Sequence, residues 1–333
     1  MTVRVGINGF GRIGRNFYRA LRARGADIEV VAVNDLGSPE VMAHLLRRDS
    51  VLGPAPWEIS ASDGGIRIDG ELLPVLAQRD PATLPWGDLG VQVVVESTGF
   101  FTSRDKAAAH LDAGAHRVVI SAPARDVDAT FVVGVNDDTF DPDSHRVVSN
   151  ASCTTNCFVP MVKVLDDAFG VVQGFMSTVH AYTGDQMLVD GPHGDLRRTR
   201  AAAVNIIPTS TGAARATGLV LDAMAGRLDG IALRVPVADG SLTDFTATLE
   251  RAADADEVNA AFERAAASEP LAGVLEYSDE PLVSSDIVGS PASCVLDSGL
   301  TMAGGNLVKV CGWYDNEWGY SNRLVDLVAR IGG

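Results

Sequence analysis

The chain has 333 residues, 46% hydrophobic and 21% charged, which is long enough for two domains that each bury a core. Its formal net charge of −16 disfavours nucleic acid or an anionic membrane surface as the main partner, because such partners bind basic surfaces. We expect no signal peptide and no membrane-spanning segment, since the first residues run directly into a strand pattern and apolar runs are short. Four cysteines are too few for a disulfide scaffold, which predicts a cytoplasmic protein.

The first elements predict a dinucleotide-binding unit. Residues 3–8 (VRVGIN) form the short apolar run of a buried strand, and apolar side chains four apart then indicate a helix. Between them stand the glycines of a G-x-G-x-x-G motif, Gly9, Gly11 and Gly14. At such a strand-to-helix turn, backbone N–H groups and the helix dipole bind a pyrophosphate.

An acidic residue follows the second predicted strand, residues 30–33. Asp35 lies about 20 residues beyond the last glycine, where this fingerprint has an acid for the ribose hydroxyls. A carboxylate there repels a 2′-phosphate, which favours NAD over NADP. The alternative is a glycine-rich turn without a ligand, and the combination of strand, glycines, helix and acid argues against it.

Further short apolar runs predict a parallel sheet buried on both faces. The expected strands are residues 91–95, 118–120, 131–133 and 147–148. An Ala-rich helix is expected over 105–117, with Gly114 as a helix stop. We therefore predict a Rossmann-type, doubly wound α/β domain over residues 1–150.

The second half has longer strands with partial alternation, which predicts an α+β catalytic domain with a mixed or antiparallel sheet over residues 151–315. The expected strands are residues 171–182, 231–238, 245–250 and 307–314. A helix over 254–267 has Asp254 and Glu257 at capping-box spacing and buries Val258, Phe262 and Ala265. We expect a C-terminal helix, about residues 316–333, to pack back on the first domain.

The stretch SNASCTTNC, residues 149–157, places Cys153 in the first turn of a helix, where unpaired N–H groups and the helix dipole stabilise a thiolate. Cys157, one turn later, is expected to be a buried apolar side chain, the usual state of an isolated cysteine. A metal site or a disulfide is a weaker interpretation, since C-x-x-x-C without further ligands is a poor zinc signature.

A thiol nucleophile needs a base, and His180 ends a strand at the polar stretch HAYTGDQ, where a side chain can enter a cleft. The remaining histidines are interpreted as surface, packing or loop residues: His44, His110, His116, His145 and His193.

Basic and hydroxyl side chains in the second half suit an anionic substrate. They are Arg197, Arg198 and Arg200, then Thr209, Ser210, Thr211 and Gly212, and Arg234. The arginine cluster could instead be an exposed or subunit-facing loop, and Thr-Ser-Thr-Gly a helix entry. Arg234 interrupts an apolar strand, and a buried arginine requires an anion or a carboxylate.

These motifs together resemble phosphorylating glyceraldehyde-3-phosphate dehydrogenases. The resemblance runs from residue 3 to about 330 and rests on NGFGRIGR, SNASCTTNC, HAYTGDQ, DLRRTRAAAVNIIPTSTGAA and WYDNEWGYSNR. It implies Cys153 as nucleophile, His180 as base, and NAD as cofactor without a metal. It also implies glyceraldehyde 3-phosphate and inorganic phosphate as substrates, and a homotetramer in which the loop of about 182–205 lies near a neighbouring subunit's cofactor.

The resemblance further implies two sets of binding residues. The NAD contacts would be Arg12, Ile13, Asp35, Arg79, Ser121 and Asn316, beside the glycines. The contacts of the substrate phosphate and inorganic phosphate would be Ser152, Thr154, Thr183, Arg198, Thr211, Gly212 and Arg234.

The chain departs from the family pattern in two places. Asp190, Gly191 and Pro192 stand where NAD-preferring members usually carry Leu-Pro, so a side chain that excludes a 2′-phosphate is absent. Behind the nucleophile, Phe158, Val159 and Met161 replace residues of other shapes. One hypothesis is a paralogue that resists a thiol-directed inhibitor; neutral repacking is the alternative.

Two other functions stay open on the sequence. Erythrose-4-phosphate dehydrogenases share the cysteine and histidine but lack the HAYTGDQ and PTSTGAA forms seen here. A redox-sensing or binding protein would use the same exposed, low-pKa thiol, which oxidises readily.

Overall fold

The computed structural model describes residues 2–333, and the chain forms two compact units. Unit 1 comprises Met1–Phe131, Thr139–Ala151 and Ser321–Gly333, and unit 2 comprises Val132–Asp138 and Ser152–Tyr320. Within residues 2–333, no helix has both the length and the apolar character needed to cross a membrane.

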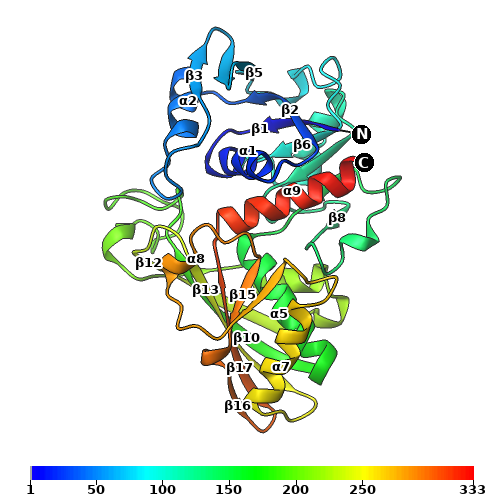
Figure 1. Cartoon of the computed structure of the whole chain (residues 1–333), viewed down its shortest axis with the longest axis vertical. Coiled ribbons are helices and arrows are strands. Elements are labelled where there is room, and N and C mark those ends of the chain that lie inside the picture. Colours follow the sequence, from blue (N-terminus) through cyan, green and yellow to red (C-terminus); the bar gives the residue numbers. More distant parts are fainter. Residues whose placement is uncertain (1) are drawn as a thin grey trace. The chain divides into compact units, whose positions relative to one another are not determined.

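Unit 1 is built around a sheet of nine strands in the order β3-β4-β5-β2-β1-β6-β7-β9-β8. Strands β1, β2 and β6 of this sheet are labelled in Figure 1. The strands are β1 (Val3–Asn8), β2 (Ile28–Asn34), β3 (Ile59–Ser62), β4 (Gly65–Ile68), β5 (Glu71–Leu76), β6 (Val93–Glu96), β7 (Arg117–Ile120), β8 (Ala129–Thr130) and β9 (Val147–Ser149). The helices are α1 (Arg12–Arg24), α2 (Pro39–Arg47), α3 (Arg104–Ala107) and α4 (Ala109–Asp112). All pairings from β5 to β8 are parallel, which confirms the expected Rossmann-type sheet.

Strand β1 lies between β2 and β6, so the chain leaves the sheet centre in one direction and returns to β1 from the other side. Asn8, Asn34 and Glu96 end these three strands and are register partners. Open α/β sheets bind ligands at such a switch point, beyond the carboxyl ends of the strands.

Two expected elements of this half differ from the structure. The strand expected at 131–133 is wrong, because β8 ends at Thr130 and the backbone N–H groups of Val132 and Gly134 bond the side chains of Asn136 and Asp137 instead of a strand. The helix expected over 105–117 is two short helices, α3 and α4. At their junction, Leu111 N donates a hydrogen bond to Ala108 O, three residues earlier, as in a 3₁₀ turn.

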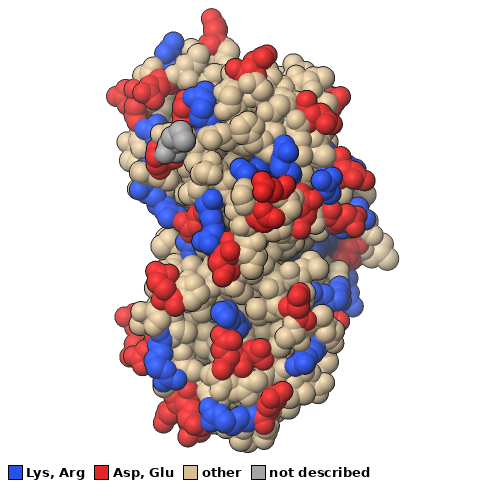
Figure 2. All heavy atoms as spheres, turned by 90° about the vertical axis from the view of Figure 1, so that its right-hand side faces the viewer, with Lys and Arg blue, Asp and Glu red and all other residues tan. Residues whose placement is uncertain are grey.

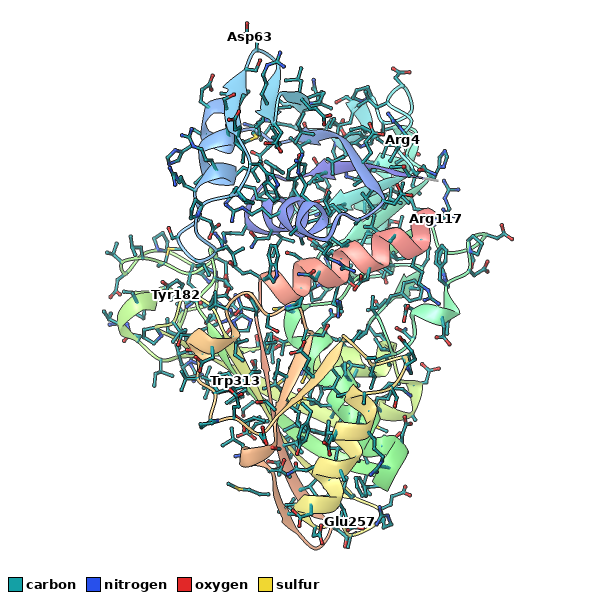
Figure 3. All side chains as sticks on the ribbon, viewed as in Figure 1. Arg4, Asp63, Arg117, Tyr182, Glu257 and Trp313 are labelled. Carbon is teal, nitrogen blue, oxygen red and sulfur yellow. The ribbon has the colours of Figure 1, made fainter. Side chains whose placement is uncertain are left out.

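Helix α9 (Trp318–Gly332) follows unit 2 in the chain, and its residues from Ser321 onward belong to unit 1. Asp326 on α9 pairs with Arg24 at 2.6 Å, and Arg117, labelled in Figure 3, donates to Ile331 O at 3.0 Å in the last turn. These contacts attach the C-terminal segment to the unit that contains the N-terminal strand.

Unit 2 contains a mixed sheet in the order β11-β12-β10-β13-β17-β15-β14, with β16 paired to β17. The strands are β10 (Val171–Ala181), β11 (Ile207–Ser210), β12 (Leu228–Val235), β13 (Ser241–Leu249), β14 (Leu275–Ser278), β15 (Cys294–Asp297), β16 (Met302–Gly304) and β17 (Leu307–Tyr314). The helices are α5 (Cys153–Phe169), α6 (Ala213–Ala216), α7 (Ala255–Ala266) and α8 (Ser284–Ile287). Across the two units, the short 3₁₀ turns are η1 (Pro81–Thr83), η2 (Asp137–Thr139), η3 (Ala202–Val204), η4 (Thr217–Leu219), η5 (Asp222–Met224) and η6 (Ser298–Leu300). The expected mixed sheet is confirmed.

Helix α7 begins with the predicted capping box, in which Asp254 and Glu257 each accept the other's backbone N–H. Val258 and Phe262 are buried as expected, whereas Ala265 is only half-buried and Ala261 takes the buried position. The apolar faces of helices α5 and α7 both contribute to the core of unit 2.

Candidate active site

Helix α5 presents Cys153 at its first residue. Ser152 is the N-cap, and its Oγ accepts a hydrogen bond from Thr155 N at 3.0 Å, which fixes the start of the helix. Ala151, immediately before the cap, has a φ of 55°, a left-handed conformation that costs free energy for any residue with a Cβ. The turn into α5 is therefore specified locally and places the thiol at the positive helix end.

Strand β10 carries His180 as its penultimate residue, and His180 Nε2 lies 3.5 Å from Cys153 Sγ. The imidazole is 3% exposed, and its Nδ1 lies 2.7 Å from Ala181 O. With the ring proton on Nδ1 and donated to that carbonyl, the Nε2 lone pair faces the thiol; Arg234 Nη1, 2.8 Å from Nδ1, then contacts this nitrogen without a hydrogen bond. The structure therefore brings the predicted nucleophile and base together.

Burial opposes charge on both groups. It raises the pKa of Cys153 to about 11, although Arg234 and the Thr154 N–H lower it. Burial and Arg234 together lower the pKa of His180 to about 3. Desolvation thus opposes the thiolate that the start of α5 favours; the thiol proton needs an acceptor, and His180 Nε2 is in place for it.

Arg234 of β12 is the register partner of His180 on the neighbouring strand. Its Nη1 lies 2.8 Å from His180 Nδ1 and donates to Ala181 O at 3.1 Å and to Thr183 Oγ1 at 3.3 Å. Its Nε is buried without a hydrogen-bond partner among the described residues. A buried guanidinium N–H that lacks an acceptor suits an anionic ligand at this point.

A second cation lies in the loop after β10, which passes Tyr182, labelled in Figure 3. Arg198 donates from Nη1 to Asp185 Oδ2 at 2.6 Å and from Nε to Thr209 Oγ1 at 3.0 Å. Asp185 also accepts a hydrogen bond from Thr183 Oγ1, so one carboxylate joins two predicted phosphate ligands. Sequence reasoning missed Asp185.

Three predicted phosphate ligands have other bonds in the structure. Thr154 is buried and its hydroxyl shares a hydrogen bond with Tyr314 Oη at 2.9 Å, so its side chain is not presented to an anion. Thr211 Oγ1 accepts from Ala213 N at 3.2 Å, and Gly212 is the N-cap of the short helix α6. The antiparallel register of β11 on β12 places Ile207, not the Thr211 end, beside Arg234.

Tyr314, which sequence reasoning also missed, ends β17 under the catalytic pair. Its Oη bonds the hydroxyls of Thr154 and Thr178, and its ring meets that of His180 edge-on at 5.9 Å. Burial raises the pKa of the Tyr314 hydroxyl well above its ordinary value. The tyrosine is therefore a neutral support for the imidazole.

Unit 1 has a cavity of about 460 Å³ at the switch point of its sheet. Its lining residues follow strand ends: Asn8, Gly9, Gly11, Asn34, Asp35, Leu36, Gln78, Arg79, Ser97, Thr98, Phe100 and Phe101. Four of the predicted NAD residues line this cavity: Gly9, Gly11, Asp35 and Arg79. The other lining residues were missed, although each lies within five residues of the carboxyl end of a strand.

Two of the motif glycines, Gly9 and Gly14, are required by close contacts. A Cβ on Gly9, whose φ is 93°, would lie 2.7 Å from Thr98 N, and one on Gly14 would lie 2.2 Å from Gly9 O. Gly11 has open space around its Cα. It is the N-cap of α1, and because it has no side chain it leaves the N–H groups of the first helical turn uncovered. A pyrophosphate can therefore approach the start of α1 closely, which fits a dinucleotide.

The other predicted NAD residues lie outside this cavity lining. The Arg12 side chain pairs with Asp49 at 2.5 Å, and Ile13 is half-buried in α1. Ser121 follows β7 and donates its N–H to Glu96 O, whereas Asn316 is buried in unit 2 and accepts from Ser241 Oγ at 2.6 Å. The Asp35 carboxylate accepts the N–H groups of Phe10 and Gly37.

Three residues behind the nucleophile, Cys157, Phe158 and Met161, belong to the apolar core of unit 2. Phe158, Val159, Met161 and Cys157 are fully buried. The Phe158 ring packs edge-on against Phe245 of β13 at 4.8 Å, and Cys157 Sγ bonds Gly312 O. All four cysteines are free, and residues 2–333 contain no group of three His, Cys, Asp or Glu side chains arranged to hold a metal ion.

The chain matches two family descriptions. One is "Glyceraldehyde 3-phosphate dehydrogenase, NAD binding domain" over residues 3–104, and the other is "Glyceraldehyde 3-phosphate dehydrogenase, C-terminal domain" over residues 152–316.

Similar full-length relatives are named glyceraldehyde-3-phosphate dehydrogenase. The Streptomyces coelicolor protein is 60% identical over 333 residues, the Streptomyces arenae protein 2 is 61% identical over 332, and the Mycobacterium avium protein is 60% identical over 338. Each alignment covers 100% of this chain and 99% of the relative. The chain belongs to the glyceraldehyde-3-phosphate dehydrogenase family.

Proposed function

We propose that the chain catalyses the NAD-dependent oxidative phosphorylation of D-glyceraldehyde 3-phosphate to 1,3-bisphosphoglycerate, a step of glycolysis and gluconeogenesis. The observation that carries this proposal is the Cys153–His180 pair, 3.5 Å apart, with Arg234 beside the imidazole. The full-length relatives and both family matches support the same activity.

Cys153 and His180 are the proposed catalytic residues. Sγ attacks the aldehyde carbon as His180 Nε2 takes the thiol proton, and returning this proton to the former carbonyl oxygen gives a thiohemiacetal. His180 then accepts the hydroxyl proton as the carbon is oxidised, which leaves a thioester on Sγ. NAD, when bound, supplies the hydride acceptor.

Inorganic phosphate then attacks the thioester carbon, and the product leaves as Sγ regains a proton from His180. The Cys153 N–H at the start of α5 and His180 can stabilise the oxyanion formed in each addition. Arg234 and Arg198 are the proposed cations for the two phosphate groups, with Ser152, Thr183, Thr211 and Gly212 as neighbours. An anion bound to Arg234 offsets the positive charge that lowers the pKa of His180, so substrate makes the base stronger.

We propose that residues 1–150 with the C-terminal helix form the NAD-binding domain and that residues 151–315 form the catalytic domain. The first-turn N–H groups of α1 would hold the pyrophosphate, and Asp35 would accept hydroxyls of a ribose. Arg79 lines the same cavity. Arg12, Ile13, Ser121 and Asn316 remain proposed contacts that rest on the family resemblance.

We propose that further copies of this chain bind its surface to form a homotetramer. The loop after β10 exposes large apolar side chains that an isolated chain would leave in water: Leu188, Val189, Leu196, Val204 and Ile206. On the face drawn in Figure 2, acidic and basic side chains are interspersed, and the formal net charge is −16, so a polyanion such as nucleic acid is disfavoured. We also propose a cytoplasmic location, where the catalytic thiol stays reduced.

The decisive experiment is NADH formation from glyceraldehyde 3-phosphate, measured with and without inorganic phosphate. We expect turnover that requires phosphate and disappears in Cys153→Ala. Faster, phosphate-independent oxidation of erythrose 4-phosphate would favour the rival dehydrogenase, and absence of any NADH would leave a redox or binding role for the thiol.

A further inference from the structure

A chain of buried polar side chains connects the ends of the three central strands of unit 1. Asn34 Nδ2 donates to Asn8 Oδ1 at 2.7 Å, and Asn8 Nδ2 donates to Glu96 Oε2 at 2.6 Å. All three side chains are 2–4% exposed. The carboxyl ends of β2, β1 and β6 are thus fixed to one another by side chains as well as by the sheet.

Glu96 is the centre of this network. Besides Asn8, its carboxylate accepts the backbone N–H of Thr98 at 2.8 Å and the Thr98 hydroxyl, and it meets His110 Nε2 at 3.0 Å. A buried carboxylate is stable only when donors satisfy its oxygens, so the positions of all these donors depend on one another.

His110 holds a single tautomer in this arrangement. Trp86 Nε1 lies 3.0 Å from His110 Nδ1, and an indole N–H can only donate, so Nδ1 carries the lone pair. The ring proton is therefore on Nε2 and is donated to Glu96. Asn8 Nδ2, 3.4 Å from the same nitrogen, is a second donor to Glu96 and not a partner of the ring. Both Trp86 and His110 are completely buried.

The network reaches the cavity through its outer members. Asn8, Asn34 and Thr98 line the cavity, whereas Glu96, His110 and Trp86 lie behind it. Thr98 Oγ1 accepts Phe100 N at 3.1 Å, so fixing Thr98 also fixes the turn that follows it. Thr98 N is the atom that would meet a Cβ on Gly9 at 2.7 Å, so this turn packs directly on the glycine motif.

We propose that Glu96, His110 and Trp86 are positioning residues for the dinucleotide: they hold the cavity wall formed by Asn8 and Thr98 in its binding conformation. The inference rests on the proposed function, in which this cavity receives NAD. A preformed wall spares the ordering cost that a ligand would otherwise meet, so the network acts on NAD affinity and not on the chemistry at Cys153.

The test compares the dissociation constant of NAD, measured by calorimetry on the whole enzyme, with KM for each substrate and with kcat at saturating NAD. In Glu96→Gln, an amide –NH₂ group replaces one carboxylate oxygen. This group can only donate hydrogen bonds, so it cannot pair with the donors that the oxygen accepted from. We expect NAD to bind about 10-fold or more weakly, while kcat and KM for glyceraldehyde 3-phosphate stay within about twofold.

The histidine gives a matched pair of variants. His110→Gln supplies one acceptor and one donor and should keep NAD affinity within about threefold of wild type, whereas His110→Leu should lose about 10-fold. His116→Gln, an exposed histidine of the same unit, is the control and should change nothing. Trp86→Phe, which removes the donor to Nδ1 together with part of the buried ring, should lower NAD affinity by a few-fold.

Unchanged NAD affinity in folded Glu96→Gln, or equal losses in His110→Gln and His110→Leu, would overturn the inference. A drop in kcat at saturating NAD without a change in NAD affinity would overturn it too. If Glu96→Gln does not fold, the His110 and Trp86 variants decide by the same criteria. Failure of the wild-type chain to bind NAD would instead refute the proposed function, and the inference with it.

Discussion

The reactivity of Cys153 depends on its neighbour because burial opposes the thiolate. The pKa of the thiol is raised to about 11 by desolvation, and His180 Nε2 lies 3.5 Å from Sγ as a proton acceptor. In His180→Asn this acceptor is lost, so we expect alkylation of Cys153 by iodoacetamide near neutral pH to slow by about 10-fold or more, and turnover to fall by roughly 10²–10⁴.

The alkylation rate should be measured without cofactor, with Cys153→Ala as the blank for the three other cysteines. Those three are buried and should react slowly. An alkylation rate in His180→Asn equal to that of wild type would mean that the helix N-terminus alone activates the thiol, contrary to the burial argument.

Asp239 is a buried carboxyl without a full set of donors. It is 3% exposed in the turn between β12 and β13; its Oδ1 accepts Gly240 N at 2.8 Å, and its Oδ2 has no partner among the described residues. Burial and the adjacent carboxylate of Asp315, with a smaller effect of Glu317, raise the pKa of Asp239 to about 8. A proton on Oδ2 would supply the donor that faces Asp315.

This carboxyl makes the free energy of unfolding depend on pH. The pKa of this carboxyl is near 3.9 in the unfolded chain and about 8 in the folded one, so between these pH values only the folded state keeps Asp239 protonated. The stabilisation from this proton is complete below about pH 3.9 and is lost as pH rises towards 8. The slope is at most about 1.4 kcal/mol per pH unit. In Asp239→Asn, whose amide can donate to Asp315, we expect a flatter profile and a gain of roughly 1–2 kcal/mol near pH 8.

Urea unfolding of both proteins at several pH values checks this prediction. Asp63→Asn, at the exposed loop tip labelled in Figure 3, is the control and should follow the wild-type profile. Parallel profiles for wild type and Asp239→Asn would show that Asp239 does not carry the proton.

The sequence predicted the reacting side chains better than their surroundings. Cys153 and His180 stand in recognisable local contexts, a helix start and a strand end. Thr154 has the same kind of context, yet its hydroxyl bonds Tyr314, which lies 160 residues further along the chain. A partner so distant in the chain is fixed by the order β10-β13-β17, which local patterns do not encode.

At the scale of elements, Phe158 of α5 packs edge-on against Phe245 of β13, in the apolar core that Cys153 borders. These are core packing contacts, so we favour neutral repacking over the hypothesis of resistance to a thiol-directed inhibitor. In Phe158→Leu we expect a loss of about 1–2 kcal/mol in the free energy of unfolding, from the cavity and the lost aromatic pair.

The same variant should react with an active-site electrophile at the wild-type rate, measured by loss of NADH formation over time. A several-fold faster inactivation of folded Phe158→Leu would restore the resistance hypothesis, because it would show that this side chain shields the thiol.

Elements with a regular pattern were predicted well, whereas the short apolar segment 131–133 was not. Strand β1 and helix α7 match their apolar periods, and the capping box fixes the start of α7. The segment 131–133 is apolar enough for a strand, but the side chains of Asn136 and Asp137 take the N–H groups that strand pairing would use. Such local competition depends on side-chain geometry that hydrophobic period does not describe.

At the scale of the whole molecule, the sequence predicted two domains from the change in strand pattern and a dinucleotide-binding turn from one glycine motif. The sequence did not predict the network behind the cavity. His110 was interpreted as a surface or packing residue, since a histidine in an Ala-rich helical stretch gives no sign of a buried carboxylate contributed by another strand. Only the sheet order brings Glu96 beside Asn8.

The exposed apolar loop after β10 carries the last prediction, which concerns assembly. Ile206 is 67% exposed in the single chain, just before β11. In Ile206→Asp we expect the tetramer to dissociate to smaller species, because a charge buried between subunits without a partner costs several kcal/mol.

Sedimentation velocity at micromolar concentration measures the assembly, and circular dichroism reports whether the subunit stays folded. The control is Val41→Asp on α2 of unit 1, which is 54% exposed and lies outside the loop. A tetramer that survives in folded Ile206→Asp would exclude this residue from the interface, and a wild-type monomer would refute the homotetramer itself.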